Sequence, residues 1–486
     1  MLFNSIAFLL FLPLVFCIYW WLGRRSSLRV QNTFIVIASY VFYGWWDWRF
    51  LFLIAFTTYC SYLSGLWIDR SRAKGKGKKQ IKAIAAANIV LNLGILCLFK
   101  YFNFFQENLI ELFAAIGYEL DYVTLNVLLP VGISFYTFQA LSYTIDVYRK
   151  RIETARDPIA FFAFVSFFPQ LVAGPIERAT NLYPQFLRRR TFDYAEACDG
   201  CRLMLWGFFK KLAVADSAAA VVNVVFADVN SYNATTLLIG AILFAFQIYG
   251  DFSGYSDIAM GTSKLFGIRL MKNFNLPYFS RDIAEFWRRW HISLNTWFRD
   301  YVYIPLGGSR VRRSLIVRNT FAIFLLSGLW HGANWTFITW GAYHAALFLP
   351  LILLGRNRKY TDVVAAGRTW ARPHEVLQMG VTFLLVTIGW IIFRAMDIHQ
   401  ALHYIARLAD LSAYAFPNLD GMTLLAVAES SLAIFVMLFL EWKSRMKPHP
   451  LCWYAKLPVR WCGYLLFSVW SFLSYTTGQA FIYFQF

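Results

Sequence analysis

The residues best suited to proton transfer are the seven histidines, and His331 stands out among them by its surroundings. It lies in the segment LWHGANW (residues 329–335), in the middle of a long apolar run. An imidazole takes or gives a proton near pH 7, so a histidine at this place could act as a general base on a hydroxyl group. Ionisable groups at membrane depth are costly and are therefore functional hypotheses. The alternative is a structural histidine bonded to a neighbouring helix.

His291 lies in a second segment, residues 281–294, which mixes charged and aromatic side chains. At helical spacing its apolar residues share one side and its charged residues the other, which predicts an amphipathic helix lying at the cytoplasmic membrane interface. Because arginine pairs well with phosphates, we expect Arg288 and Arg289, with Trp287 beside them, to bind an anionic donor such as a coenzyme A thioester. The alternative is a simple membrane anchor.

Further polar side chains occur within apolar stretches. Asp251, Ser253 and Asp257 follow one another in the segment DFSGYSD, and Asn334 interrupts the run that contains His331. We expect each to have an internal partner, since polar groups in a membrane rarely remain unpaired, and to support the site structurally.

Several other chemistries are not supported. Cys198 and Cys201 form a lone pair without a second half, so no metal site is expected. The chain has no P-loop, no G-x-S-x-G elbow and no dinucleotide fingerprint. We therefore expect no tightly bound cofactor.

The composition indicates a protein that lies in a membrane. Of 486 residues, 59% are hydrophobic and only 15% are charged, whereas a soluble chain has about 25% charged residues. The net charge of +19 comes from short basic clusters between apolar runs, the pattern of cytoplasmic loops, so no nucleic-acid partner is expected. We predict an all-α polytopic membrane protein that forms a single domain over residues 1–486.

Two of the candidate membrane spans are broken, and one of the breaks contains His331. A helix needs about 20 mostly apolar residues to cross a bilayer. Residues 159–175 carry two prolines and a glycine near their end and are predicted to enter the membrane without crossing it. Residues 319–352 are too long for one crossing, and Gly and Asn residues interrupt them at 328–334. Irregular backbone at membrane depth survives only inside protein or along a wet cavity, which makes 328–334 the first candidate for a site. The candidate spans are residues 3–22, 33–46, 50–68, 83–101, 125–147, 159–175, 203–227, 236–265, 319–352, 377–396, 423–441 and 458–478.

The Lys and Arg clusters predict the orientation, because such clusters remain in the cytoplasm. The loop at 103–124 has four acidic residues and no Lys or Arg, so we expect it outside. The last span then delivers residues 476–486 to the outer face. The expected cytoplasmic clusters are residues 24–29, 70–82, 149–151, 188–190, 310–318, 356–372 and 443–447.

The segments EFWRRWH (285–291) and LWHGA (329–333) resemble the membrane-bound O-acyltransferase (MBOAT) family, and in particular its bacterial branch that acts in alginate and peptidoglycan O-acetylation. The resemblance runs from the first span to the tail. Further matching segments are LPVGISFYTF (129–138), FPQLVAGP (168–175), DFSGYSD (251–257) and RDY (299–301).

This resemblance implies a horseshoe of about 11–13 helices, with re-entrant or broken segments, around a central funnel. The family's two signature positions fall on His291 and His331, of which His331 would be essential. The donor would be cytoplasmic acetyl-CoA. Acetyl would cross the bacterial cytoplasmic (inner) membrane to a periplasmic SGNH-type O-acetyltransferase partner, so the polysaccharide acceptor would be reached indirectly. Membrane lipid is the remaining expected partner.

The tail adds a third candidate. The segment FIYF (481–484) resembles an F-x-Y-F pattern of related systems, which implies that Tyr483 is a transient acetyl carrier served by His331. The alternative for Tyr483 is aromatic packing at the membrane interface.

Other functions remain open from the residues alone. A polysaccharide transporter or flippase would explain the spans and the charge, and a non-catalytic export scaffold would not need His331. A lipid acyltransferase of the same broad family would need a tunnel for a long acyl chain.

Overall fold

The part of the chain that the computed structural model describes consists of helices joined by turns and loops. That part comprises residues 1–122, 129–172, 174–452, 456–475 and 481–482. Within these ranges the backbone forms α-helices, short 3₁₀ segments and π segments, and no β-strand. The prediction of an all-α protein is confirmed.

Among the described residues, seven helices are long and apolar enough to cross a membrane. Six of them match predicted spans and the seventh forms the second half of the predicted span 319–352, and the chain is a multi-pass membrane protein. These helices are α1 (Ile6–Arg25), α3 (Phe50–Ala73), α4 (Lys78–Lys100), α12 (Ala234–Leu265), α16 (Trp335–Leu353), α17 (Pro373–Arg394) and α19 (Gly421–Lys443).

The chain divides into two compact units. The first consists of Met1–Gly200 and Ala259–Met271, and the second of Cys201–Ile258 and Lys272–Phe486. The predicted single domain and the predicted horseshoe both concern the arrangement of these units, and they remain predictions.

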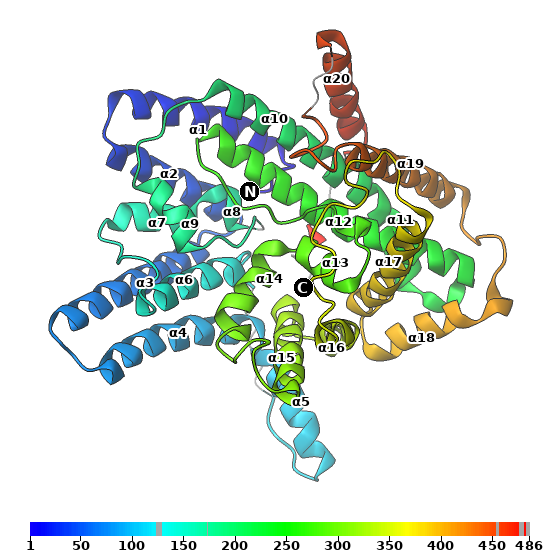
Figure 1. Ribbon diagram of the computed structural model, residues 1–486, viewed down its shortest axis with the longest axis horizontal. Coiled ribbons are helices and arrows are strands. Elements are labelled where there is room, and N and C mark those ends of the chain that lie inside the picture. The colour runs from blue at the N-terminus through cyan, green and yellow to red at the C-terminus, as the bar shows by residue number, and fades with distance from the viewer. Residues whose placement is uncertain (123–128, 173, 453–455, 476–480, 483–486) are drawn as a thin grey trace. The chain divides into compact units, whose positions relative to one another are not determined.

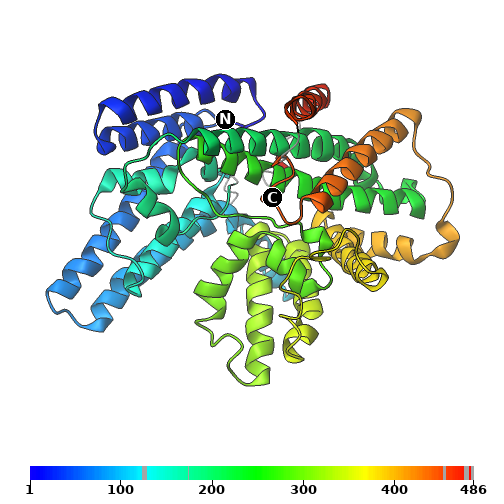
Figure 2. The ribbon, with the colours of Figure 1, turned by 45° about the horizontal axis from the view of Figure 1, so that its top comes forward.

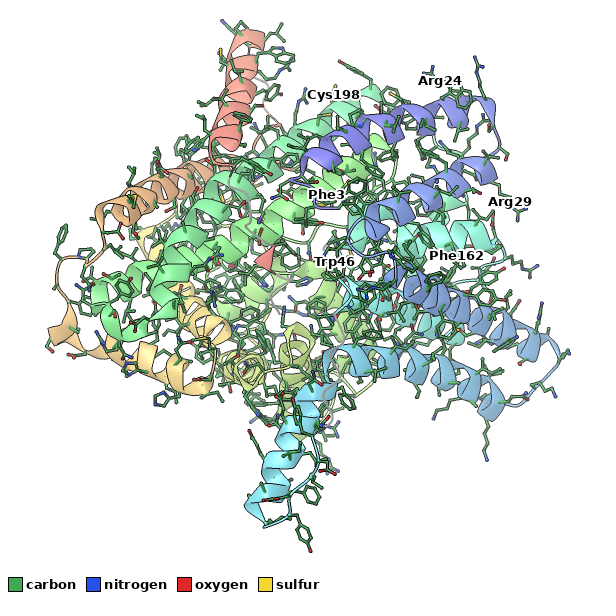
Figure 3. The ribbon with its side chains drawn as sticks, turned by 180° about the vertical axis from the view of Figure 1, so that it is seen from behind. Phe3, Arg24, Arg29, Trp46, Phe162 and Cys198 are labelled. Atoms are coloured by element: carbon green, nitrogen blue, oxygen red, sulfur yellow. The ribbon has the colours of Figure 1, made fainter. Side chains whose placement is uncertain are left out.

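The first unit begins with a helical hairpin of α1 and α2 (Leu28–Gly44), which Figure 2 shows side by side. Ser27 starts α2 by accepting a backbone N–H of the first turn, at 3.4 Å. Arg24 and Arg29 lie at the same end of the hairpin (Figure 3). The basic cluster predicted to face the cytoplasm is therefore the turn between the two helices.

Polar side chains join three of the following helices inside the first unit. Its further helices are α5 (Phe102–Ala115), α6 (Ile133–Tyr148), α7 (Pro158–Ser166), α8 (Phe168–Leu171) and α9 (Ala179–Phe186). Asn88 of α4 donates to the hydroxyl of Thr144 on α6 at 2.7 Å, and Ser64 of α3 lies 3.2 Å from the same hydroxyl. Such bonds between buried side chains hold helices together where apolar surroundings offer no water.

The predicted span 159–175 is broken, as its prolines suggest. Asp157 caps α7 by accepting the N–H of Ile159 at 2.9 Å, and α7 ends at Ser166, before the single turn of α8. Neither piece is long enough to cross a bilayer.

The second unit contains the predicted break at residues 328–334. Its further elements are η1 (Lys210–Asp216, a π-helix), α11 (Ser217–Ala227), α13 (Ile283–Arg289), α14 (Ile292–Phe298), η4 (Arg299–Tyr303, a π-helix), α15 (Arg313–His331), α18 (Ile398–Ala409) and α20 (Leu457–Leu473), and α10 (Tyr194–Phe209) runs from the first unit into the second. Helices α15 and α16 form a hairpin (Figure 1). The chain leaves the helix at Gly332, and Asn334 starts α16 by accepting the N–H of Thr336 at 3.0 Å.

Two glycines allow the arms of this hairpin to approach closely. A Cβ at Gly328 would lie 2.2 Å from the carbonyl oxygen of Phe337, and one at Gly341 would lie 2.4 Å from that of Phe324. Both neighbours are backbone atoms, so α15 and α16 could accept a larger residue only by moving apart.

The predicted amphipathic helix over residues 281–294 is wrong. The structure has two short helices, α13 and α14, that meet at His291, and most of their side chains are buried. The charged residues Arg281, Glu285 and Arg289 are 7%, 1% and 7% exposed, because they pair with one another instead of facing water. Helical periodicity cannot distinguish a charged face in water from a charged face that is paired inside the protein.

Gly328→Ala is expected to destabilise the protein, because the added methyl group overlaps the backbone of α16. Overpacking of this kind costs about 1–3 kcal/mol, which thermal unfolding in detergent would measure. Gly380→Ala on α17 is the matched control, since nothing lies within 4 Å of its Cβ position. Equal unfolding temperatures for both variants would contradict the close packing of α15 and α16.

Candidate active site

His331 ends α15 and lies in an aromatic pocket. Its side chain is 5% exposed. The ring contacts Trp330, Trp340 and Phe393, with centroid separations of 5.0, 5.2 and 5.3 Å. The break at Gly332 therefore places the imidazole in apolar surroundings. Little water is present there to compete with it for the proton of a substrate.

His291 joins α13 to α14 in the left-handed region of the backbone, with φ +43°. This conformation is uncommon for a residue with a Cβ, and strain of this kind clusters at functional sites. Asn273 holds the strained segment, because its carbonyl oxygen accepts the N–H of Ile292 at 2.8 Å. The helix break is thus fixed from a separate loop.

The tautomer of His291 follows from its neighbour. The side-chain oxygen of Asn273 lies 3.1 Å from Nδ1 of His291, and it also accepts from the hydroxyl of Ser293 at 2.9 Å. An amide oxygen only accepts hydrogen bonds, so Nδ1 donates and the lone pair resides on Nε2. Burial lowers the pKa of His291 to about 3, and the ring is therefore neutral near pH 7.

The structure brings the two predicted histidines together. The rings of His291 and His331 have centroids 6.5 Å apart, and Trp330 packs against both. The two histidines are 40 positions apart along the chain, and both occur where a helix of the second unit stops. Figure 1 shows α13, α14, α15 and α16 as neighbours.

A cavity of about 760 Å³ lies in the second unit and carries strong positive charge. Four arginine side chains line it: Arg288, Arg299, Arg310 and Arg358. Of these four, Arg299 forms an ion pair with Asp300 at 2.7 Å. The cavity is suited to a ligand that carries several negative charges, such as a phosphate-bearing molecule.

The inner wall of this cavity approaches the histidine pocket. Ser327 lines the cavity one helical turn before His331 on α15. Trp287 also lines the cavity and packs on Trp340 at 5.5 Å, and Trp340 in turn packs on His331. A long anionic molecule with its charged end at the arginines would point its other end toward the two histidines.

The predicted donor-binding residues take different positions. Trp287 and Arg288 line the cavity, and Arg288 also donates to the backbone carbonyls of Asn357 and Tyr360. Arg289 is buried and pairs with Glu285 at 2.7 Å.

Glu285 is the centre of a buried ion network. It pairs with Arg281 at 3.0 Å and with Arg289 at 2.7 Å, and Arg281 reaches on to Asp362 at 2.8 Å. The hydrogen bond from Arg281 lowers the pKa of the Asp362 carboxyl. This network ties α13 to the loop of Asp362.

The supporting polar residues all have partners within the second unit. Asp251 pairs with Lys211 at 2.7 Å. Lys210 pairs with Asp257 at 2.6 Å and donates to Ser253 at 2.9 Å. Asn334, besides capping α16, donates to the carbonyl oxygen of Met396 at 3.0 Å.

Tyr483 lies outside the described residues. The two residues before it, Phe481 and Ile482, are each 1% exposed. The backbone N–H of Ile482 donates to Asp251 at 2.6 Å. The end of the described chain is therefore inside the second unit.

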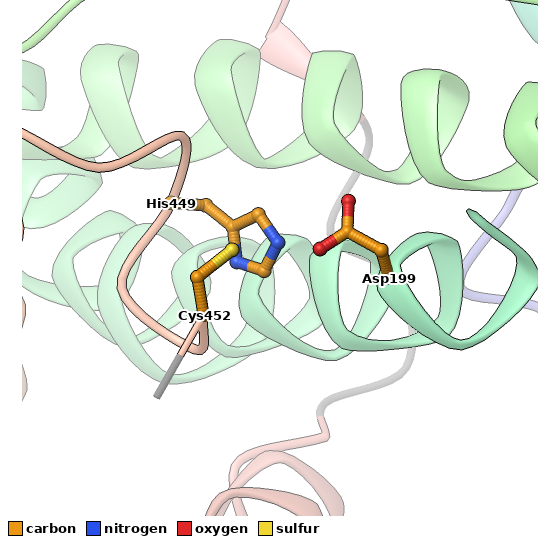
Figure 4. A group of neighbouring side chains, drawn as sticks. All are labelled: Asp199, His449 and Cys452. Carbon is orange, nitrogen blue, oxygen red and sulfur yellow. The ribbon is translucent and has the colours of Figure 1, made fainter. Parts of the chain in front are cut away.

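Asp199, His449 and Cys452 are side chains of types that can bind metal ions, and they belong to two different units. Figure 4 shows Asp199, His449 and Cys452. Asp199 belongs to the first unit, where it forms an ion pair with Lys264. His449 and Cys452 belong to the loop after α19 in the second unit, where the N–H of Cys452 donates to the carbonyl oxygen of His449 at 3.2 Å.

The sequence did not predict the role of three of the cavity arginines, or that of Asn273, which is hydrogen-bonded to His291. Arg310 and Arg358 lie in basic clusters, which in the sequence indicate only orientation, and Arg299 lies in the RDY segment. Their positive charge can be read from the sequence, but their positions around one cavity cannot. Asn273 gave no signal in the sequence, because its role depends on a loop that folds back on α14.

Comparisons with known proteins give consistent results. Residues 19–372 match the family model described as MBOAT, membrane-bound O-acyltransferase family. A probable alginate O-acetylase AlgI of Pseudomonas aeruginosa is 41% identical over 442 residues, which cover 90% of this chain and 81% of the relative. A peptidoglycan O-acetyltransferase of Helicobacter pylori is 32% identical, covering 86% of this chain and 82% of the relative. A teichoic acid D-alanyltransferase of Bacillus subtilis is 28% identical over 57% of this chain and 71% of the relative.

Glu285→Ala is expected to destabilise the protein strongly, because it leaves two buried arginines without their shared carboxylate. Breaking a buried pair from one side costs about 3–5 kcal/mol. Thermal unfolding should show a clear decrease in the midpoint temperature. Asp69→Ala is the control, since the Asp69–Arg156 pair is 3.9 Å long with side chains 49% and 87% exposed, and such surface pairs contribute about 0–1 kcal/mol. Equal losses in the two variants would mean that the network does not hold α13.

Proposed function

Because this chain belongs to the membrane-bound O-acyltransferase family, we propose that it transfers acetyl from cytoplasmic acetyl-CoA across the bacterial inner membrane, for the O-acetylation of an extracytoplasmic polysaccharide. Family membership makes the chain an acyltransferase. The acetyl donor, the direction of transfer across the membrane and the acceptor are what we propose. Two of the relatives named above are an alginate and a peptidoglycan O-acetylating protein by name, so the proposed acceptor is alginate, peptidoglycan or a similar glycan.

One observation carries this proposal. Two buried histidines lie with ring centroids 6.5 Å apart, next to a cavity of about 760 Å³ whose wall carries four arginines. A polyanionic carrier with a reactive end remote from its charges fits this arrangement. Coenzyme A has its phosphates at one end and its thioester at the other.

The charge pattern of the loops supports entry of the donor from the cytoplasm. Arg310 and Arg358 line the cavity and lie in basic clusters at 310–318 and 356–372. Basic loops of this kind remain on the cytoplasmic side. The phosphates would bind these arginines, and the thioester would extend past Ser327 toward His331.

The proposed reaction is acyl transfer with His331 as the general base. His331 takes the proton of the acceptor hydroxyl while that oxygen attacks the thioester carbonyl. The C–S bond breaks, an ester C–O bond forms, and the proton on His331 passes to the departing sulfur, which leaves as coenzyme A thiol. No net charge is created, and His331 returns to its neutral form.

His291 is proposed to assist this step without acting as the base. Its neutral ring, with the Nδ1 proton donated to Asn273, is unsuited to accept a proton near pH 7 because its pKa is about 3. It would instead orient His331 or the acyl group by contact. Substitution of His291 should therefore have a smaller effect than substitution of His331.

Tyr483 is proposed as the first acceptor. Its acetyl ester would then be passed to the serine of an extracytoplasmic SGNH-type transferase, which acetylates the glycan. The burial of Phe481 and Ile482 in the same unit as the histidines supports this step, since the chain immediately before Tyr483 is held there.

The first test uses acetyl-CoA with a radiolabelled acetyl group and the purified full-length chain. Wild-type protein is expected to retain label, and His331→Ala and Tyr483→Phe to lose it, because general-base catalysis contributes about 10²–10⁴-fold. His291→Ala should reduce labelling less. Label that is unchanged in His331→Ala would refute the catalytic assignment and favour a transporter or scaffold.

The second test concerns the cavity. Replacing both Arg310 and Arg358 by Ala is expected to raise KM for acetyl-CoA at least tenfold with little change in kcat, because charge-assisted hydrogen bonds contribute about 1.5–3 kcal/mol each. Arg313→Ala is the charge-matched control, since Arg313 is exposed at the start of α15. With S-acetylpantetheine, which lacks the phosphates, the double variant and wild type should be equal. A raised KM for both donors would contradict phosphate binding by these arginines.

A further inference from the structure

The last described residues of the chain are buried, although they lie only a few positions before the C-terminus. Phe481 and Ile482 are each 1% exposed. We propose that Asp251, held in place by Lys211, is a positioning residue that anchors the C-terminal segment through the backbone amide of Ile482. The expected effect of the anchor on acetyl transfer rests on the proposed function. The anchor itself does not depend on that function.

The anchor is a carboxylate with one partner on each oxygen. One oxygen of Asp251 accepts the N–H of Ile482 at 2.6 Å, and the other lies 2.7 Å from the ammonium of Lys211. Both distances are short, as is typical of charge-assisted hydrogen bonds. Because the donor is a backbone amide, the bond determines where the segment lies along α12. It does not require a particular side chain at position 482.

A π-helix brings the lysine to this place. In η1 two adjacent residues, Lys210 and Lys211, both reach α12, where they pair with Asp257 at 2.6 Å and with Asp251 at 2.7 Å. Adjacent residues of an α-helix point about 100° apart, and the wider π turn relaxes this limit. Isolated π turns inside α-helices are frequent at functional sites.

Glycine makes the approach of α12 possible. A Cβ at Gly254 would lie 2.7 Å from the carbonyl oxygen of Gly207 and 3.0 Å from the backbone nitrogen of Lys211. The two backbones therefore touch at this level. A short gap is what allows the lysine ammonium to reach a carboxylate on the opposite helix.

In the ion pairs around the anchor, carboxylates outnumber lysines. Lys211 also pairs with Asp216 at 2.8 Å, so two lysines serve the three carboxylates of Asp216, Asp251 and Asp257. All three lysine–carboxylate pairs are largely buried. A buried carboxylate needs every partner it can obtain, and the amide of Ile482 supplies one to Asp251.

Aromatic contacts continue from the anchored segment to the histidine pocket. The ring of Phe481 packs on Tyr255 at 4.7 Å and lies 6.2 Å from Phe252. Phe252 follows Asp251 on α12, and its ring packs edge-on against His291 at 4.7 Å. The anchor thus holds the end of the chain one aromatic ring away from His291.

The test measures hydrogen–deuterium exchange of the C-terminal peptide in the full-length protein, together with acetyl transfer. In Asp251→Leu the Ile482 amide loses its acceptor, so exchange of this peptide should be at least tenfold faster and acetyl transfer at least tenfold slower, with KM for acetyl-CoA unchanged. Asp251→Asn keeps one accepting oxygen for two donors, Lys211 and the Ile482 amide, so its exchange rate should lie between those of wild type and Asp251→Leu.

Two further variants separate anchoring from a general loosening of the charge network. Asp216→Leu removes one carboxylate partner of Lys211 but leaves Asp251, the acceptor of the Ile482 amide. Exchange of the C-terminal peptide should therefore stay within twofold of wild type. Ile482→Pro removes the donor and leaves α12 intact, so it should show the same faster exchange of the C-terminal peptide, and it provides the test if Asp251→Leu does not fold. The double variant should be no worse than Ile482→Pro alone.

Three outcomes would overturn the anchor: wild-type exchange in Asp251→Leu, equal release of the tail by Asp216→Leu, or full protection in Ile482→Pro. Exchange needs no acetyl donor. Failure of the proposed function would therefore appear as absence of acetyl transfer in the wild type, while the exchange data still decide the anchor.

Discussion

Charge that is removed from water must be paired, and this requirement organises the second unit. Lys211 and Asp251 join η1 to α12, and Glu285 joins α13 to the loop of Asp362 through Arg281. Losing one partner of such a pair leaves a charge that apolar surroundings cannot accommodate. The pairs therefore fix the relative positions of helices that carry no catalytic group themselves, and these helices surround the two histidines.

Both histidines occur where regular structure stops. Each break leaves backbone groups that must find other partners, and asparagines supply them: Asn273 binds the segment after His291, and Asn295 donates to the carbonyl oxygens of Trp287 and Trp290 at 2.7 and 2.5 Å. Helix ends thus give the imidazoles positions that a continuous helix could not, and side-chain amides stabilise those ends.

The sequence was sufficient for features that depend on local composition. Apolar runs of span length became helices, and the glycines and asparagine at 328–334 marked a real hairpin turn. It was insufficient where distant segments meet. The charged face of residues 281–294 turned inward because its partners lie on α13 itself and at Asp362. The convergence of four arginines on one cavity likewise depends on several loops at once, and no periodicity encodes it.

The π-helix at Lys210–Asp216 has a consequence for the length of the chain. A π turn contains one more residue than the α turn it interrupts. The wide turn absorbs this extra residue, so α11, which follows it, keeps the phase with which it packs on α19. This stretch therefore tolerates exchange of its apolar side chains more readily than any change in spacing. An insertion here would rotate α11 relative to the core of the second unit, and a deletion would close the turn from which Lys210 and Lys211 both reach α12.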